Sequence, residues 1–183
     1  MRLGGEVLAI LDRSGHGFTR SRGLYWNSVL HACRREWPIV EERSAAAIAS
    51  AQERGLAMVV AVGRIMRGTA RAMLDPGDEY LAEIRGALAA YRATGARLQM
   101  TYHLVLLAQA LADCDRHGEG LGALREAAAL AEETGERFAE AEIHRVEGNL
   151  LLAENGSAEA EACYVRALSA PSGTSPNNRR WLE

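Results

Sequence analysis

The chain has 183 residues, of which 48% are hydrophobic and 25% are charged, and its formal net charge is −3. This is an ordinary composition for a globular protein, and it provides no general attraction to nucleic acid or to anionic membranes. All 21 basic residues are arginine, which excludes a P-loop lysine, a Schiff-base lysine and a lysine general base.

The residue types favour helices over strands. Alanine and leucine together occupy 55 positions, whereas valine, isoleucine and threonine together occupy 21. Alanine and leucine stabilise helices, and β-branched residues favour strands. We therefore expect an all-α protein.

A repeat of 40 residues runs through the chain. Four glycines recur at this spacing, at Gly15, Gly55, Gly95 and Gly135. Small residues recur in the same register, at Gly68, Ala108 and Gly148. A turn-forming sequence near the middle of each repeat, such as Asp75-Pro76-Gly77, divides it in two. Each repeat is therefore predicted to be two closely packed helices, closed by a glycine in the left-handed conformation.

In chain order, the sequence predicts a helical fragment at 5–13 and then four helix pairs in repeats of about 15–54, 55–94, 95–134 and 135–170. The predicted helices are 19–35 with 38–53, 57–74 with 78–93, 97–116 with 119–133, and 136–154 with 157–169. The polar segment 171–183 is predicted to be a loose C-terminal tail. Because one helix pair cannot bury its own apolar face, we expect a right-handed α-solenoid that forms a single domain over 1–170.

The repeat resembles a tetratricopeptide repeat of the longer, roughly 40-residue kind. The first-helix pattern is matched by Leu104, Leu107, Ala108 and Leu111, and the second-helix pattern by Ala160, Tyr164 and Ala167. The second repeat departs from this pattern, since Arg64, Arg67 and Arg71 occupy positions where apolar residues are expected.

Two longer segments, 86–95 and 134–152, resemble the C-terminal tetratricopeptide-like region of bacterial regulators that also carry an adenylate or guanylate cyclase domain and an ATPase domain. This resemblance covers about residues 5–168 and includes no cyclase or ATPase segment. It implies a cytoplasmic scaffold for signalling that binds a peptide or a partner domain. It leaves open whether the chain is a fragment of such a regulator or a separate protein.

The resemblance implies that partners bind to a concave face formed by the first helix of each pair. The predicted contact residues are Arg22, Tyr25, Trp26, Ile65, Tyr102, Val105, Gln109, Arg145 and Asn149. Arg145 and Asn149 resemble half of an arrangement that holds a carboxylate at the end of an acidic peptide. For Trp26 and Tyr102, packing in the interior is the alternative interpretation. A small-ligand sensor that binds a metabolite between repeats is the rival function.

The sequence predicts no catalytic residue, metal or cofactor. His31 and Cys33 are two residues apart, so on a helix their side chains diverge and cannot pair. The segment 113–117 contains Cys114 and His117, which can bind a metal ion. No second His/Cys pair with the same spacing exists to complete a metal site. The early arginine and aromatic cluster is followed closely by acidic residues, so nucleic-acid binding is not expected.

Three features concern compartment and assembly. Three widely spaced cysteines fit a reduced cytosol, and no apolar run is long enough to span a bilayer. Residues 1–75 carry 11 arginines and 7 acidic residues, whereas 76–183 carry 10 arginines and 17 acidic residues. This charge polarity makes head-to-tail or two-fold self-association a hypothesis.

Overall fold

The computed structural model describes residues 17–154 and 156–170, and within these ranges the chain is all-α. The described residues form eight helices and no strands: α2 (Gly17–Cys33), α3 (Trp37–Gln52), α4 (Ala57–Leu74), α5 (Asp78–Ala93), α6 (Met100–Asp113), α7 (His117–Thr134), α8 (Glu140–Ala153) and α9 (Ser157–Ser169). The expected fold class is confirmed at this level. The predicted fragment at 5–13 and the predicted tail at 171–183 lie outside the described residues.

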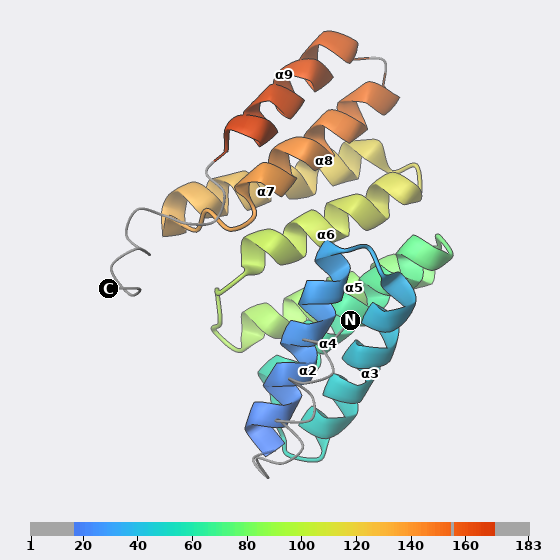
Figure 1. Cartoon of the computed structure of the whole chain (residues 1–183), viewed down its shortest axis with the longest axis vertical. Coiled ribbons are helices and arrows are strands. Elements are labelled where there is room, and N and C mark those ends of the chain that lie inside the picture. Colours follow the sequence, from blue (N-terminus) through green and yellow to red (C-terminus); the bar gives the residue numbers. More distant parts are fainter. Residues whose placement is uncertain (1–16, 155, 171–183) are drawn as a thin grey trace. The chain divides into compact units, whose positions relative to one another are not determined.

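The chain divides into two compact units, Met1–Ala96 and Arg97–Glu183, which we call unit 1 and unit 2. In unit 1, α3 packs against α2 and α4, and α4 packs against α5. In unit 2, α6 packs against α7, α7 against α8, and α8 against α9 (Figure 1). The first helices of successive pairs also meet within each unit, α2 with α4 and α6 with α8.

Three predicted helices, 57–74, 78–93 and 157–169, have the bounds observed for α4, α5 and α9. The largest differences are at α6 and α8, which begin three or four residues later than predicted. Before α6, Gln99 has a left-handed backbone with φ of 62°. Before α8, the Glu140 N–H donates to the Arg137 carbonyl in a separate turn. These turns interrupt the helical hydrogen bonding and delay each helix.

Three of the four repeat glycines lie in the described ranges and have the predicted left-handed conformation, while Gly15 lies outside the described residues. Gly55, Gly95 and Gly135 have φ values of 64°, 75° and 72°. At Gly55, the following N–H of Leu56 donates to the Ala51 carbonyl over 3.0 Å and closes the end of α3. The left-handed backbone conformation thus recurs every 40 residues, as the glycines do in the sequence.

A second turn recurs near the middle of the repeats. The N–H groups of Glu36, Arg116 and Gly156 each donate to the carbonyl five residues earlier, over 3.0, 2.9 and 2.9 Å. The equivalent residue of the second repeat is Pro76, which has no N–H to donate. Asp75 is accordingly extended, with φ of −149°, whereas Arg35 and Asp115 in the equivalent positions are left-handed.

Paired helices approach closely at two of the small residues of the repeat. A Cβ atom on Gly68 of α4 would lie 2.9 Å from Cγ1 of Ile84 on α5. A Cβ atom on Gly148 of α8 would lie 2.7 Å from the ring of Tyr164 on α9. These contacts confirm the expected close packing, because any side chain at either glycine would need a neighbour to move.

The unexpected arginines of α4 connect helices within unit 1. Arg67 forms an ion pair with Glu83 of α5. The Nε of Arg71 lies 2.8 Å from the Glu41 carboxylate of α3, and its Nη1 lies 3.9 Å from Glu83. The hydrogen bond to Glu41 raises the pKa of Arg71 above its ordinary value. Two of the three departures from the apolar pattern thus form a charged network that joins α3, α4 and α5.

We expect Gly95→Ala to lower the free energy of unfolding by about 1 kcal/mol, because alanine is strained at a left-handed φ even where space is free. Gly86→Ala is the matched control. Gly86 lies inside α5, and its Cβ would also meet nothing within 4 Å, so alanine there should stabilise the helix by up to about 1 kcal/mol. Urea titration followed by circular dichroism measures both changes, and a shift in the same direction would contradict the cap assignment.

Candidate functional site

The predicted contact residues of unit 1 divide by exposure. Tyr25 on α2 and Ile65 on α4 are buried. On α2, Trp26 is 41% exposed, and Arg22 is half-buried. The buried pair belongs to the interior of this structure, so the accessible part of the prediction in unit 1 lies on α2.

In unit 2, the two predicted apolar contacts, Tyr102 and Val105, are buried on α6. The predicted polar residues Gln109 and Arg145 are half-buried, and Asn149 is exposed. Tyr102 packs edge-on against Phe138, with 5.6 Å between ring centroids. Of the nine predicted contact residues, four are therefore buried and five are half-buried or exposed. They are divided between unit 1 and unit 2.

One face of α2 carries three exposed large apolar side chains. It consists of Phe18, Arg22, Trp26 and Leu30, four residues apart, and we call it the α2 face. Phe18, Trp26 and Leu30 are 54%, 41% and 49% exposed. The Arg22 guanidinium lies 6.0 Å from the centre of the Phe18 ring, which places a cation beside the apolar surface.

Two members of the α2 face, Phe18 and Leu30, were missed by sequence reasoning. The repeat register continues from Trp26 to Val29, but Val29 is buried, whereas Leu30 is 49% exposed. A strict four-residue step from Trp26 in both directions would have found Phe18, Arg22 and Leu30 together. The segment 17–33 also contains no Asp or Glu, so this face is both apolar and basic.

In unit 2, the predicted carboxylate-binding residues already have partners within the chain. Arg145 holds Glu142, with Nη2 2.7 Å from Oε2 and Nε 3.1 Å from both carboxylate oxygens. Gln109 of α6 donates to the same carboxylate over 3.4 Å. The Oδ1 of Asn149 accepts a hydrogen bond of 2.9 Å from Tyr164. A carboxylate from a partner would therefore have to replace Glu142.

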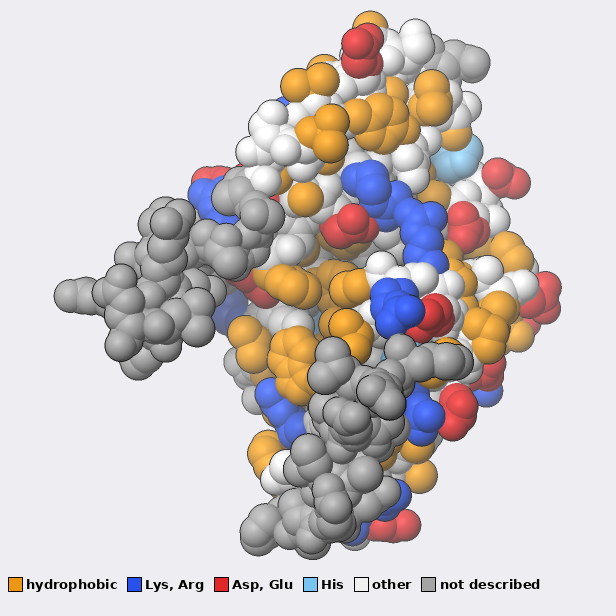
Figure 2. All heavy atoms as spheres, viewed as in Figure 1, with side chains coloured by type: hydrophobic (Ala, Val, Ile, Leu, Met, Phe, Trp, Pro, Cys, Tyr) orange, Lys and Arg blue, Asp and Glu red, His pale blue; other side chains and the backbone are white. Residues whose placement is uncertain are grey.

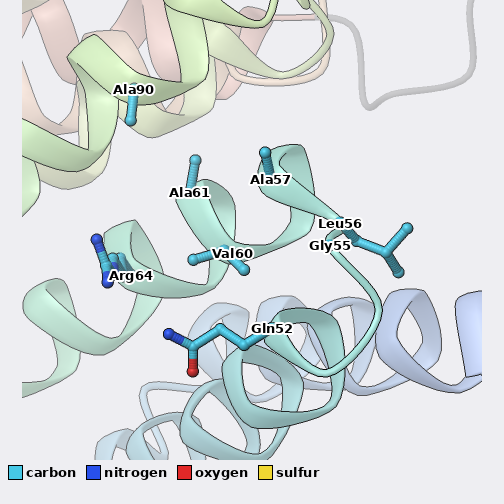
Figure 3. Close-up of a pocket in the computed structure, with 8 residues that line it drawn as sticks. All are labelled: Gln52, Gly55, Leu56, Ala57, Val60, Ala61, Arg64 and Ala90. Carbon is cyan, nitrogen blue, oxygen red and sulfur yellow. The ribbon is translucent and has the colours of Figure 1, made fainter.

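Unit 1 contains a pocket with a volume of about 370 Å³. Its lining comes from the end of α3, the turn after it, α4 and α5 (Figure 3). Most of the lining is apolar and small, including Ala57, Ala61 and Ala90, while Gln52 and Arg64 supply polar groups. Figure 3 shows Ala57 and Ala61 pointing toward the side on which Ala90 lies, with Gln52 reaching in from α3.

Among the cysteines and histidines of the described residues, His31 and His144 contact carboxylates and Cys163 is buried. His31 hydrogen-bonds to Glu36 rather than to Cys33, and this bond holds the pKa of Glu36 below its ordinary value. Burial raises the pKa of the Cys163 thiol, which opposes formation of a thiolate. His144 lies 3.6 Å from Glu147 as an i, i+3 pair. In the described ranges, no three His, Cys, Asp or Glu side chains are grouped to hold a metal ion.

Comparisons with protein families, with curated proteins and with solved structures found no match to this chain. Among the described residues, no helix combines the length and apolar composition needed to cross a membrane. The site must therefore be interpreted from its own geometry, of which the α2 face and the pocket of unit 1 are the two main features.

We expect the stability of the fold to depend on His103 between pH 6.5 and pH 4. This side chain is fully buried on α6, and burial lowers its pKa from 6.5 to about 4. The unfolded chain takes up this proton near pH 6.5 but the folded chain only near pH 4, so stability is present above 6.5 and is lost as the pH falls. The contribution is up to about 3 kcal/mol.

Urea titrations at several pH values, on the wild type and on His103→Gln, measure this dependence. The variant removes one titrating group, so its stability should fall less steeply between pH 6.5 and 4. Comparing the two proteins cancels the common contribution of the surface carboxylates. Equal slopes in the two proteins would show that His103 is not responsible.

Proposed function

We propose that this chain is an interaction module of the tetratricopeptide type, a right-handed α-solenoid of stacked helix pairs that binds a peptide or a partner domain. The recurrence of the left-handed turns at 40 residues supports the repeat assignment. The resemblance of 86–95 and 134–152 to regions of cyclase and ATPase regulators supports a regulatory role. The single observation that carries the proposal is the exposed α2 face.

The chemistry of the α2 face suits a protein partner. Protein interfaces are enriched in aromatic residues and arginine and poor in acidic residues, which is the composition of this face. About half of Phe18, Trp26 and Leu30 is exposed. Covering each of them contributes on the order of 1 kcal/mol. Trp26 and Arg22 are the expected anchors, because these residue types dominate binding hot spots.

The accessible contact residues predicted in unit 2 are polar. Gln109, Arg145 and Asn149 are accessible. Arg145 would exchange Glu142 for a carboxylate of the partner, so the net gain is smaller than for an unpaired arginine. We therefore assign the main contact to the α2 face.

Photo-crosslinking tests the proposed function. A photoreactive phenylalanine replaces Trp26 in the full chain, which is then expressed and irradiated in its native cells. The matched control carries the same group at Ala46, which is exposed on α3 in the same unit. We expect defined crosslinked products from position 26 and none from position 46. The absence of products at position 26, with the fold retained by circular dichroism, would refute the proposal.

A small-ligand sensor is the second candidate, because the pocket of unit 1 is bounded by helices of two successive pairs. Its volume lies at the small end of the range for ligand sites. Apolar walls with an arginine and an amide at hand favour an apolar molecule that carries one carboxylate. The expected ligand is thus a fatty acid of short or medium chain length.

Thermal unfolding with octanoate, and with octanol as the uncharged control, tests this candidate. Octanoate should raise the melting temperature of the wild type, since a ligand that binds only the folded state stabilises it. Octanol should raise it less, and Arg64→Gln should remove the difference. Arg92→Gln, an exposed arginine outside the pocket lining, serves as the matched variant and should respond as the wild type does. A wild type indifferent to octanoate would eliminate this ligand class.

A further inference from the structure

A second exposed apolar face lies on α9, in unit 2. Val165 and Leu168 are 57% and 89% exposed. Ala162 and Ala158, one and two turns before Val165, are also exposed. Within α9, only Ala160 and Cys163 are buried. We call Ala158, Ala162, Val165 and Leu168 the α9 face. Hydrophobic side chains gather over the region of α9 in Figure 2.

The α9 face differs in charge from the α2 face. Glu161 lies one turn from Val165 and two turns from Leu168 and is exposed, and the exposed acids Glu154 and Glu159 are close in the sequence. Arg166 is also exposed on α9, so residues 154–169 carry three acidic side chains and one basic one. The segment 17–33 has Arg20 and Arg22 and no acidic residue. The two faces therefore combine apolar surface with opposite charge, which favours contact between unlike faces.

The two faces also differ in size. The α2 face presents the large side chains of Phe18, Trp26 and Leu30, whereas half of the α9 face is alanine. Large side chains on one helix can fill the grooves that small side chains leave on another. Pairing of two α2 faces would bring together two segments that carry Arg20 and Arg22 and no acidic residue, and pairing of two α9 faces would bring together two segments in which acidic residues outnumber basic ones. Like charges disfavour both symmetric arrangements.

We propose that the α9 face of one copy of this chain docks on the α2 face of a second copy. This inference rests on the proposed function, since it names the partner of the same site. The contact is heterologous, because one copy uses its α9 face and the other uses its α2 face. The first copy then still has a free α2 face and the second a free α9 face, so further copies can add. An interface made by one helix on each side is small, and the association is therefore concentration-dependent.

Sedimentation velocity of the full chain at rising concentration tests the inference. The wild type should form species larger than dimers, and association should weaken at high salt because opposite charges are screened. Trp26→Glu and Leu168→Glu each damage one face at an exposed position, and each alone should weaken association at least tenfold. Ala46→Glu, at an exposed position on α3, is the matched control and should associate like the wild type.

Mixing the two variants gives the decisive result. Trp26→Glu keeps its α9 face and Leu168→Glu keeps its α2 face, so an equimolar mixture should form a discrete dimer with one copy of each. Association of Arg22→Glu with Glu161→Arg would provide a second check. In that mixture the two altered faces meet with their charges exchanged but still opposite, and the two unaltered faces keep the native pair.

Three outcomes overturn the inference: a wild type that is monomeric at all concentrations, variants that associate normally, or a mixture that does not recombine. A monomer whose melting temperature falls on Trp26→Glu would assign the α2 face to a segment of its own chain. Photo-crosslinking at position 26 tells a failure of self-docking apart from a failure of the proposed function. Products that contain only a different protein retain the proposed function and eliminate self-docking.

Discussion

Both units depend on large side chains that fill the space above a glycine of the facing helix. Ile84 contacts the site of Gly68, Ile48 that of Gly63, and Tyr164 that of Gly148. For α3 and α4, which meet at Ile48 and Gly63, the short connection contains the left-handed Gly55. Close packing within the repeats and left-handed turns between them both recur at the 40-residue spacing.

The distribution of exposed apolar surface follows from this packing. In α2 and α9, one face is used by the neighbouring helices and the opposite face carries Trp26 and Leu30 or Val165 and Leu168. These faces are the features from which the proposed interactions arise. In unit 2, by contrast, Arg145 is held by Glu142 within the same helix, which reduces its availability to a partner.

The sequence predicted helix positions better than it predicted the site. Pro76 and the repeat glycines mark turns through backbone chemistry, which explains why the bounds of α4 and α5 were obtained correctly. The start of α6 was missed because Gln99 is left-handed, a conformation that its side chain does not signal. For Tyr102 and Val105, a contact face and a core face have the same helical spacing. The available clue was that 100–111 is apolar on nearly every side, as expected of a fully buried helix.

The charged network of unit 1 has a consequence for behaviour in alkali. Arg67 and Arg71 join α3, α4 and α5 through Glu41 and Glu83, and a guanidinium keeps its charge at pH values where a lysine ammonium becomes neutral. With arginine as the basic residue throughout the chain, these ion pairs persist in strongly basic solution and are lost only when acid protonates the carboxylates. The electrostatic part of this helix packing is therefore tolerant of base and sensitive to acid.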